Sequence, residues 1–144
     1  MKTLARIRFL PVLALALAAG CDDLGVDSGG GAVTSLTIDD LNGATLVTVS
    51  PSGSVSGSLS VPRNGQRSIR IVLQGPAGIV TPGIAESIRV NVTNSTLVSW
   101  SSTGTSTGTL IGGGAGAGNT FMRVDLISGG TSEYTSPGIT IQVT

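Results

Sequence analysis

The stretch "SIRIVLQ", residues 68–74, decides the fold class of this chain. Its side chains Ile69, Ile71 and Leu73 alternate with polar or smaller ones. A period of two places these three apolar side chains on the same face of an extended segment. The stretch therefore predicts a β-strand with one buried face.

The same alternation recurs along the chain in short runs that Gly, Pro, Asn and Ser separate. We expect a single half-buried strand at 54–61, and a loop between the turn signals at 75–76 and 82–83. No window keeps a helical period, and turn signals come about every ten residues, which is typical of a β-sandwich. The further runs are 34–39, 44–50, 86–92, 96–102, 108–112, 119–127 and 138–143.

The C-terminal part carries "VSWSS" at 98–102, the glycine-rich run "GGGAGAG" at 112–118 and "ITIQVT" at 139–144. It resembles the bacterial immunoglobulin-like repeats of the Big_2 type, which have a Trp-Ser-Ser strand, a Gly-rich hairpin and a terminal "I-x-V-T-V" strand. The matching positions are Trp100, Ser101, Ser102, Gly108, Leu110, Gly112, Ala117, Gly118, Thr120, Val124, Ile139, Ile141 and Val143.

This resemblance implies an all-β fold, a single Ig-like β-sandwich of about seven to nine strands over residues 34–144. We interpret the glycine run as a hairpin tip, because no Lys-Ser/Thr follows it as in a phosphate-binding loop. The segment 103–107 and the glycine run both depart from the repeat pattern. The strand register over 103–118 therefore stays open.

The N-terminus begins with three positive charges, followed by eleven apolar residues at 9–19. This is the pattern of a secretory signal peptide, and it is shorter than the roughly 20 residues that span a bilayer. The run ends in small residues at Ala18, Ala19 and Gly20, directly before Cys21, which is the only cysteine of the chain.

These four residues resemble the lipobox of bacterial lipoproteins. The resemblance implies cleavage between Gly20 and Cys21 and acylation of Cys21 on its sulfur and its new amino group. Since one acyl chain binds a membrane only marginally, several chains would give stable anchoring. We expect a signal peptide at 1–20 and a lipidated Cys with a flexible tether at 21–33. The alternative is an ordinary secretory signal with a chance cysteine.

Charge and residue types exclude several classes of function. Without residues 1–20 the chain keeps five arginines and eight acidic residues, a net charge of −3, with no Lys or His. Such a chain is a poor nucleic-acid binder. It also lacks the His base of a catalytic triad and the Cys and His ligands that zinc prefers. We expect no enzyme activity, no cofactor and no metal.

One acidic cluster leaves an alternative open. Asp39, Asp40 and Asn42 precede Gly43, a pattern that fits either a weak Ca²⁺ site or an Asx turn between two strands. We favour the turn, because calcium needs six to eight oxygen ligands.

Two aromatic residues are candidates for ligand binding. Trp100 and Tyr134 are the only Trp and Tyr in the chain, and either ring can stack on a sugar. The competing interpretation places Trp100 in the core, as in many β-sandwiches, and Tyr134 at a packed corner.

Together these features predict a membrane-anchored, non-catalytic Ig-like lipoprotein that is a structural or protein-binding module of the bacterial cell envelope. The alternative is a carbohydrate-binding module at the cell surface. Its expected partners are the membrane, through Cys21, and an envelope protein or glycan. The sequence leaves open the membrane leaflet and the oligomeric state. Asp22 and Asp23 fit the polar start of a linker, and the resemblance to bacterial lipoproteins implies, as the alternative, a signal for inner-membrane retention.

Overall fold

The computed structural model describes residues 32–144, which form twelve β-strands and contain no helix. The all-β class expected from the alternation is confirmed. The count exceeds nine because the expected strand over 54–61 is divided in two and because strands form at 78–80 and 131–135, where none was expected. The strands are β1 (Ser35–Asp40), β2 (Thr45–Val49), β3 (Val55–Gly57), β4 (Leu59–Val61), β5 (Gln66–Gly75), β6 (Gly78–Val80), β7 (Glu86–Val92), β8 (Val98–Ser102), β9 (Thr107–Gly112), β10 (Gly118–Ser128), β11 (Thr131–Thr135) and β12 (Ile139–Val143).

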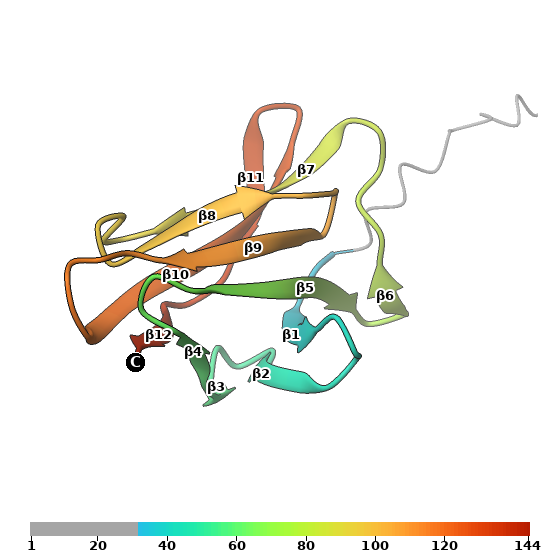
Figure 1. Cartoon of the computed structure of the whole chain (residues 1–144). Coiled ribbons are helices and arrows are strands. Elements are labelled where there is room, and N and C mark those ends of the chain that lie inside the picture. Colours follow the sequence, from blue (N-terminus) through green and yellow to red (C-terminus); the bar gives the residue numbers. More distant parts are fainter. Residues whose placement is uncertain (1–31) are drawn as a thin grey trace, which may run out of the picture.

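The strands form two sheets (Figure 1). Sheet A has the order β3-β2-β1-β5-β9-β8, with β6 paired to β5. Sheet B has the order β11-β10-β12-β4, with β7 paired to β10. All of these pairings are antiparallel except that of β4 with β12, which is parallel.

The strand order matches an immunoglobulin-type sandwich. Strands β1, β5, β9 and β8 follow the order A-B-E-D of the first immunoglobulin sheet, and β7, β10 and β12 follow the order C-F-G of the second. Strands β2 and β3 extend the first sheet beyond β1, and β4 extends the second beyond β12. The predicted Ig-like β-sandwich is therefore confirmed by its topology.

The core lies between the inner faces of the two sheets. Along β5 the buried side chains are Ile69, Ile71 and Leu73, which is the alternation that the sequence predicts. The other buried apolar residues of the cluster are Leu36, Ile38, Val47, Val49, Leu59, Val61, Val80, Val98, Leu110, Met122, Val124, Leu126, Ile139, Ile141 and Val143. Burial of branched side chains from both sheets drives the sheets together.

The expectation of one strand over 54–61 is wrong. Residues 55–57 pair with β2 in sheet A, whereas residues 59–61 pair with β12 in sheet B. The chain changes sheets at Gly57, whose φ of 90° is left-handed and unfavourable for other residues. A Cβ on Gly57 would also collide with the carbonyl oxygen of Leu46. The alternating pattern indicates burial correctly for Leu59 and Val61 but not for Val55, which is 39% exposed, and it does not show which sheet each part joins.

The expectation of a hairpin at the glycine run is also wrong. Strand β9 belongs to sheet A and β10 to sheet B, so residues 113–117 cross from one sheet to the other. The structure also settles the open register, since Trp100 pairs with Leu110 and Gly118 with Val143. A further strand, β6, forms within the predicted loop and pairs with the end of β5.

The crossing at 113–117 packs tightly against two other connections, the one between β4 and β5 and the one between β7 and β8. The backbone N–H of Gly112 donates to the carbonyl of Gly65 at 2.9 Å, and that of Gly113 donates to the carbonyl of Leu97 at 2.7 Å. The Arg63 guanidinium donates to the carbonyl of Gly114 at 2.9 Å. A Cβ on Gly113 would collide with the carbonyl of Thr96, so the close approach of these backbones requires glycine.

A buried serine separates β11 from β12, the two strands that pair with the same side of β10. Strand β12 pairs with residues 118–122 and β11 with residues 125–128 of β10, and Ser136 lies between the two. Ser136 is 2% exposed, and its Oγ accepts the N–H of Val124 at 2.9 Å. The N–H of Ser136 donates to the carbonyl of Val124 at 2.9 Å. The interruption therefore leaves both backbone polar groups of Val124 satisfied, as burial demands.

The first described residues already belong to the sandwich. Val33, at the end of the predicted tether, packs against the core, and the N–H of Thr34 donates to the carbonyl of Gln74 at 2.9 Å. The predicted signal peptide, Gly20 and Cys21 lie outside the described residues.

We predict that Gly113→Ala destabilises the fold by about 1–3 kcal/mol, because the added methyl group overpacks the contact with Thr96. Gly118→Ala is the matched control, since a Cβ there makes only ordinary contact with Leu97 at 3.6 Å. Chemical denaturation of both variants would measure the free energy of unfolding. Equal effects of the two substitutions would contradict the tight packing at Gly113.

Candidate functional site

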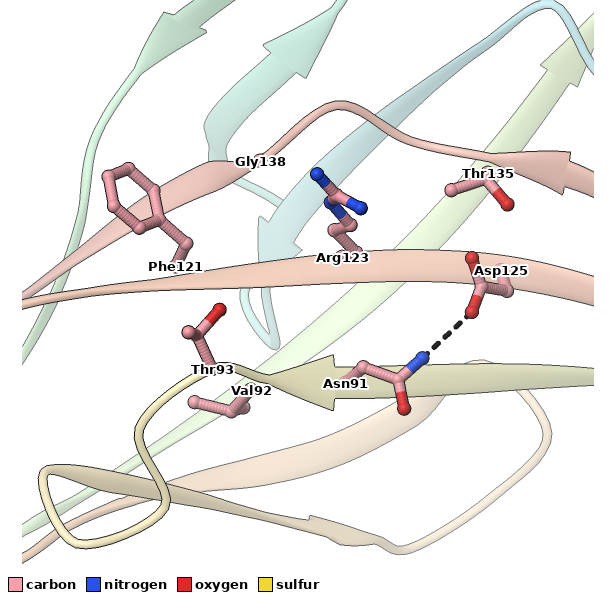
Figure 2. A pocket seen from close by; sticks show the side chains of 8 residues that line it. All are labelled: Asn91, Val92, Thr93, Phe121, Arg123, Asp125, Thr135 and Gly138. Atoms are coloured by element: carbon pink, nitrogen blue, oxygen red, sulfur yellow. Dashed lines mark hydrogen bonds between the residues drawn. The ribbon is translucent and has the colours of Figure 1, made fainter.

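A groove on the outer face of sheet B is the best candidate for a binding site (Figure 2). It has a volume of about 710 Å³ and combines one aromatic ring, one guanidinium, one carboxylate and one side-chain amide. We call it the outer-face groove. It is lined by Asn91, Val92, Thr93, Phe121, Arg123, Asp125, Thr135 and Gly138.

The alternation along β10 builds the centre of this groove. Met122, Val124 and Leu126 point into the core, so Phe121 and Arg123 project from the other face of the strand, followed by Asp125. The pairing of β10 with β7 then sets Arg123 opposite Asn91. Side chains that are 32 residues apart in the sequence thus become cross-strand neighbours, by the register Arg123↔Asn91.

Phe121 provides an apolar surface at one end of the groove. Half of its surface (50%) is exposed, although a Phe on a sheet normally gains from burial. Its ring lies against Gly138, where a Cβ would stand 3.6 Å from the ring atom Cδ1. The Phe121 ring therefore lies beside the residue that precedes β12, at ordinary contact distance.

Polar groups occupy the other end of the groove. The Asn91 amide donates from Nδ2 to Oδ2 of Asp125 at 2.8 Å, which fixes both side chains (Figure 2). The Arg123 guanidinium lies between Phe121 and Asp125. It is exposed, and its N–H groups are available to a ligand.

The groove offers binding chemistry. A guanidinium does not lose its proton in proteins, and Asp125 is the only carboxylate among the lining residues. The lining therefore does not hold the pair of carboxylates that glycoside hydrolysis uses. It can instead stack against a flat group, donate to an anionic or carbonyl oxygen, and accept from a hydroxyl or N–H.

Trp100 has a packing role in the structure. It lies on the edge strand β8, in register with the buried Leu110, and packs against the core cluster. Its ring covers Gly108 of β9, where a Cβ would overlap the ring atoms Cζ2 and Cη2. This arrangement favours the core interpretation of Trp100 and explains why residue 108 is a glycine.

Tyr134 also packs against the core, from β11 in the other sheet. Burial raises the pKa of the Tyr134 phenol above its ordinary value. Neither Trp100 nor Tyr134 lines the outer-face groove. The two aromatic residues that the sequence suggested for ligand binding are therefore not part of this site.

The acidic cluster at 39–42 forms an Asx turn, as we expected. Oδ1 of Asp40 accepts the N–H groups of Asn42 and Ala44, both at 2.9 Å. Asp39 points elsewhere and accepts the hydroxyl of Thr45 at 2.9 Å. The pKa of the Asp40 carboxyl is lowered, mainly by the hydrogen bond from Ala44 and further by that from Asn42. Residues 32–144 contain no group of three or more His, Cys, Asp or Glu side chains placed to bind a metal.

Sequence reasoning did not select Phe121, Arg123, Asn91 and Asp125 as a site. The alternation of 119–127 indicates that Phe121, Arg123 and Asp125 share the outer face. A Phe next to an Arg on an outward face is the sequence feature that could have indicated a binding site. The proximity of Asn91 depends on the register of β7 against β10, which sequence pattern alone does not give. Cys21 and Gly20 cannot be placed, because they precede the described part of the chain, and no helix within that part is long and apolar enough to cross a bilayer.

We predict that the Asp40 turn makes stability depend on pH. Its folded-state pKa lies below the unfolded value of 3.8, so its stabilisation is complete above that value and is lost as pH falls through the folded pKa. Asp40→Asn keeps an Asx acceptor but does not titrate. The difference in unfolding free energy between wild type and Asp40→Asn should therefore shrink between about pH 5 and pH 2. A constant difference would contradict the role of the ionised carboxylate.

The chain was compared with family models, curated proteins and solved structures. No family model matches the chain, and no curated protein matches it. Among solved structures, the chain is similar to the crystal structure of the S-layer protein SbsC domains 4 and 5. The two share 12% sequence identity over 76% of each chain, with a TM-score of 0.44.

Proposed function

We propose that this chain is a non-catalytic, Ig-like lipoprotein of the bacterial cell envelope, anchored to a membrane through Cys21 and acting as a protein-binding module. The observation that carries the proposal is the sequence Ala18-Ala19-Gly20-Cys21, eleven positions before the first described residue of the sandwich. Such an arrangement would expose the sandwich on the periplasmic or outer side of the membrane.

The outer-face groove supports the binding role. Aromatic and Arg side chains are enriched among the residues that contribute most to protein interfaces. Phe121 and Arg123 supply this pair on a sheet whose strands hold them in fixed register. A partner that covers Phe121 would also remove its exposed apolar surface from water, which is favourable.

A specific observation also favours the alternative, a carbohydrate-binding module. The ring of Phe121 and the hydrogen-bonded pair Asn91–Asp125 lie in the same groove, so a sugar ring could stack on the first and bond to the second. In this alternative Phe121 takes the stacking role, since Trp100 and Tyr134 pack against the core.

We predict that Cys21→Ser abolishes both acylation and membrane association. The hydroxyl cannot replace the thiol as the acceptor of the lipid, so cells fed an alkyne-tagged fatty acid should label wild type and not the variant. Cell fractionation should then find the wild type in the membrane fraction and the variant in the soluble fraction. Labelling of the variant, or membrane retention of the unlabelled variant, would contradict the anchor.

We predict that a partner contacts the groove at Phe121. A photoreactive phenylalanine at position 121 should give one cross-linked species of discrete mass in cells, and Arg123→Glu should remove it. The matched control is the same probe at Ser99, which is exposed on the edge strand of sheet A. With a purified partner, Phe121→Ala should weaken binding by at least about tenfold.

The same experiment separates the two candidate functions. Competition by soluble envelope glycans, with adducts of heterogeneous mass, would favour the carbohydrate-binding module. Equal cross-linking at positions 121 and 99 would contradict a site in the outer-face groove.

A further inference from the structure

One end of the sandwich carries a segment without charged side chains. Residues 75–85, "GPAGIVTPGIA", contain no charged side chain, and we call this segment the apolar end. It includes two of the five exposed large apolar residues of the described chain, Ile79 at 74% and Ile84 at 109% exposure. The two isoleucines lie five positions apart in this uncharged segment, and neither is covered by another part of the described chain.

These two isoleucines are presented by ordered backbone. Strand β6 pairs with β5, so that Leu73 lies opposite Val80, which is 7% exposed, and Ile79 projects outward. Beyond β6, Oε2 of Glu86 accepts the N–H of Gly83 at 2.7 Å, and the N–H of Glu86 donates to the carbonyl of Gly83 at 3.1 Å. These bonds close the loop that carries Ile84.

The N-terminal segment enters the sandwich at this same end (Figure 1). Ala32 lines a hollow of about 360 Å³ together with the apolar residues of 75–80. A Cβ on Gly75 would stand 2.6 Å from the carbonyl oxygen of Ala32, which shows how closely the two segments approach. Cys21 precedes Ala32 by eleven positions, so the two can never be more than about 36–40 Å apart.

We propose that the apolar end rests on the lipid bilayer, with Ile79 and Ile84 entering the boundary between headgroups and acyl chains. This inference rests on the proposed lipid anchor at Cys21, which would keep Ala32 and the apolar end within about 40 Å of the anchoring lipid. The segment carries no Lys or Arg, so the contact depends on apolar burial and not on anionic lipids. Two charged groups adjoin the segment: Glu86, which bonds to Gly83, and Arg70, which lines a pocket together with Ile79.

The test uses the full chain, purified in its acylated form and reconstituted into phosphatidylcholine vesicles. Ile84→Cys and Ile79→Cys receive an environment-sensitive fluorophore, because an acylated Cys21 leaves no other thiol in the chain. Leu41→Cys is the matched control. Leu41 is 53% exposed, and it follows β1 at the end opposite to Ser35 and the apolar end.

Nitroxide-labelled lipids should quench the probes at positions 79 and 84 several-fold more strongly than the probe at position 41. Equal quenching at all three positions, in protein that floats with the vesicles, would overturn the inference and leave the anchor standing. A spectral shift that grows with protein density but is insensitive to the nitroxide lipids would indicate a second copy of the chain and would also overturn it. Protein that fails to float with the vesicles would overturn the anchor itself, and the inference with it.

Discussion

Burial of one face of each central strand is the constraint on which the rest of the structure depends. Ile69, Ile71 and Leu73 on β5, and Met122 and Val124 on β10, contribute to one shared core between the sheets. A slip of one residue in either strand would move its whole apolar row to the solvent side. The register of the neighbouring strands follows from this, and so does the outward position of Phe121, Arg123 and Asn91 in the outer-face groove.

The sequence predicts the buried rows well, because a period of two along a strand is a local property. It fails where the chain changes partners. At Gly57 the alternation continues while the backbone leaves one sheet for the other, and at Gly113 a glycine run that resembles a hairpin tip is a crossing packed against Thr96. Both outcomes depend on contacts with residues far along the chain. The same limit explains why Phe121 could be assigned to an outer face while its neighbour Asn91 could not.

The two surfaces proposed for binding lie on different parts of the sandwich. The outer-face groove uses the far half of β7, at Asn91 and Val92, whereas the apolar end adjoins the beginning of that strand at Glu86. The two surfaces share no residue, so the proposed contacts with a membrane and with a partner do not compete for the same side chains.

The parallel pairing of β4 with β12 has a mechanical consequence. Leu59 faces Ile141 and Val61 faces Val143, so the chain enters this pair at one end through β3 and leaves it at the other through Thr144. A force that pulls Thr144 away from the N-terminal side would load the pair in shear, so that its hydrogen bonds resist together and do not open one by one. Survival under such a load is governed by the rate of forced unfolding.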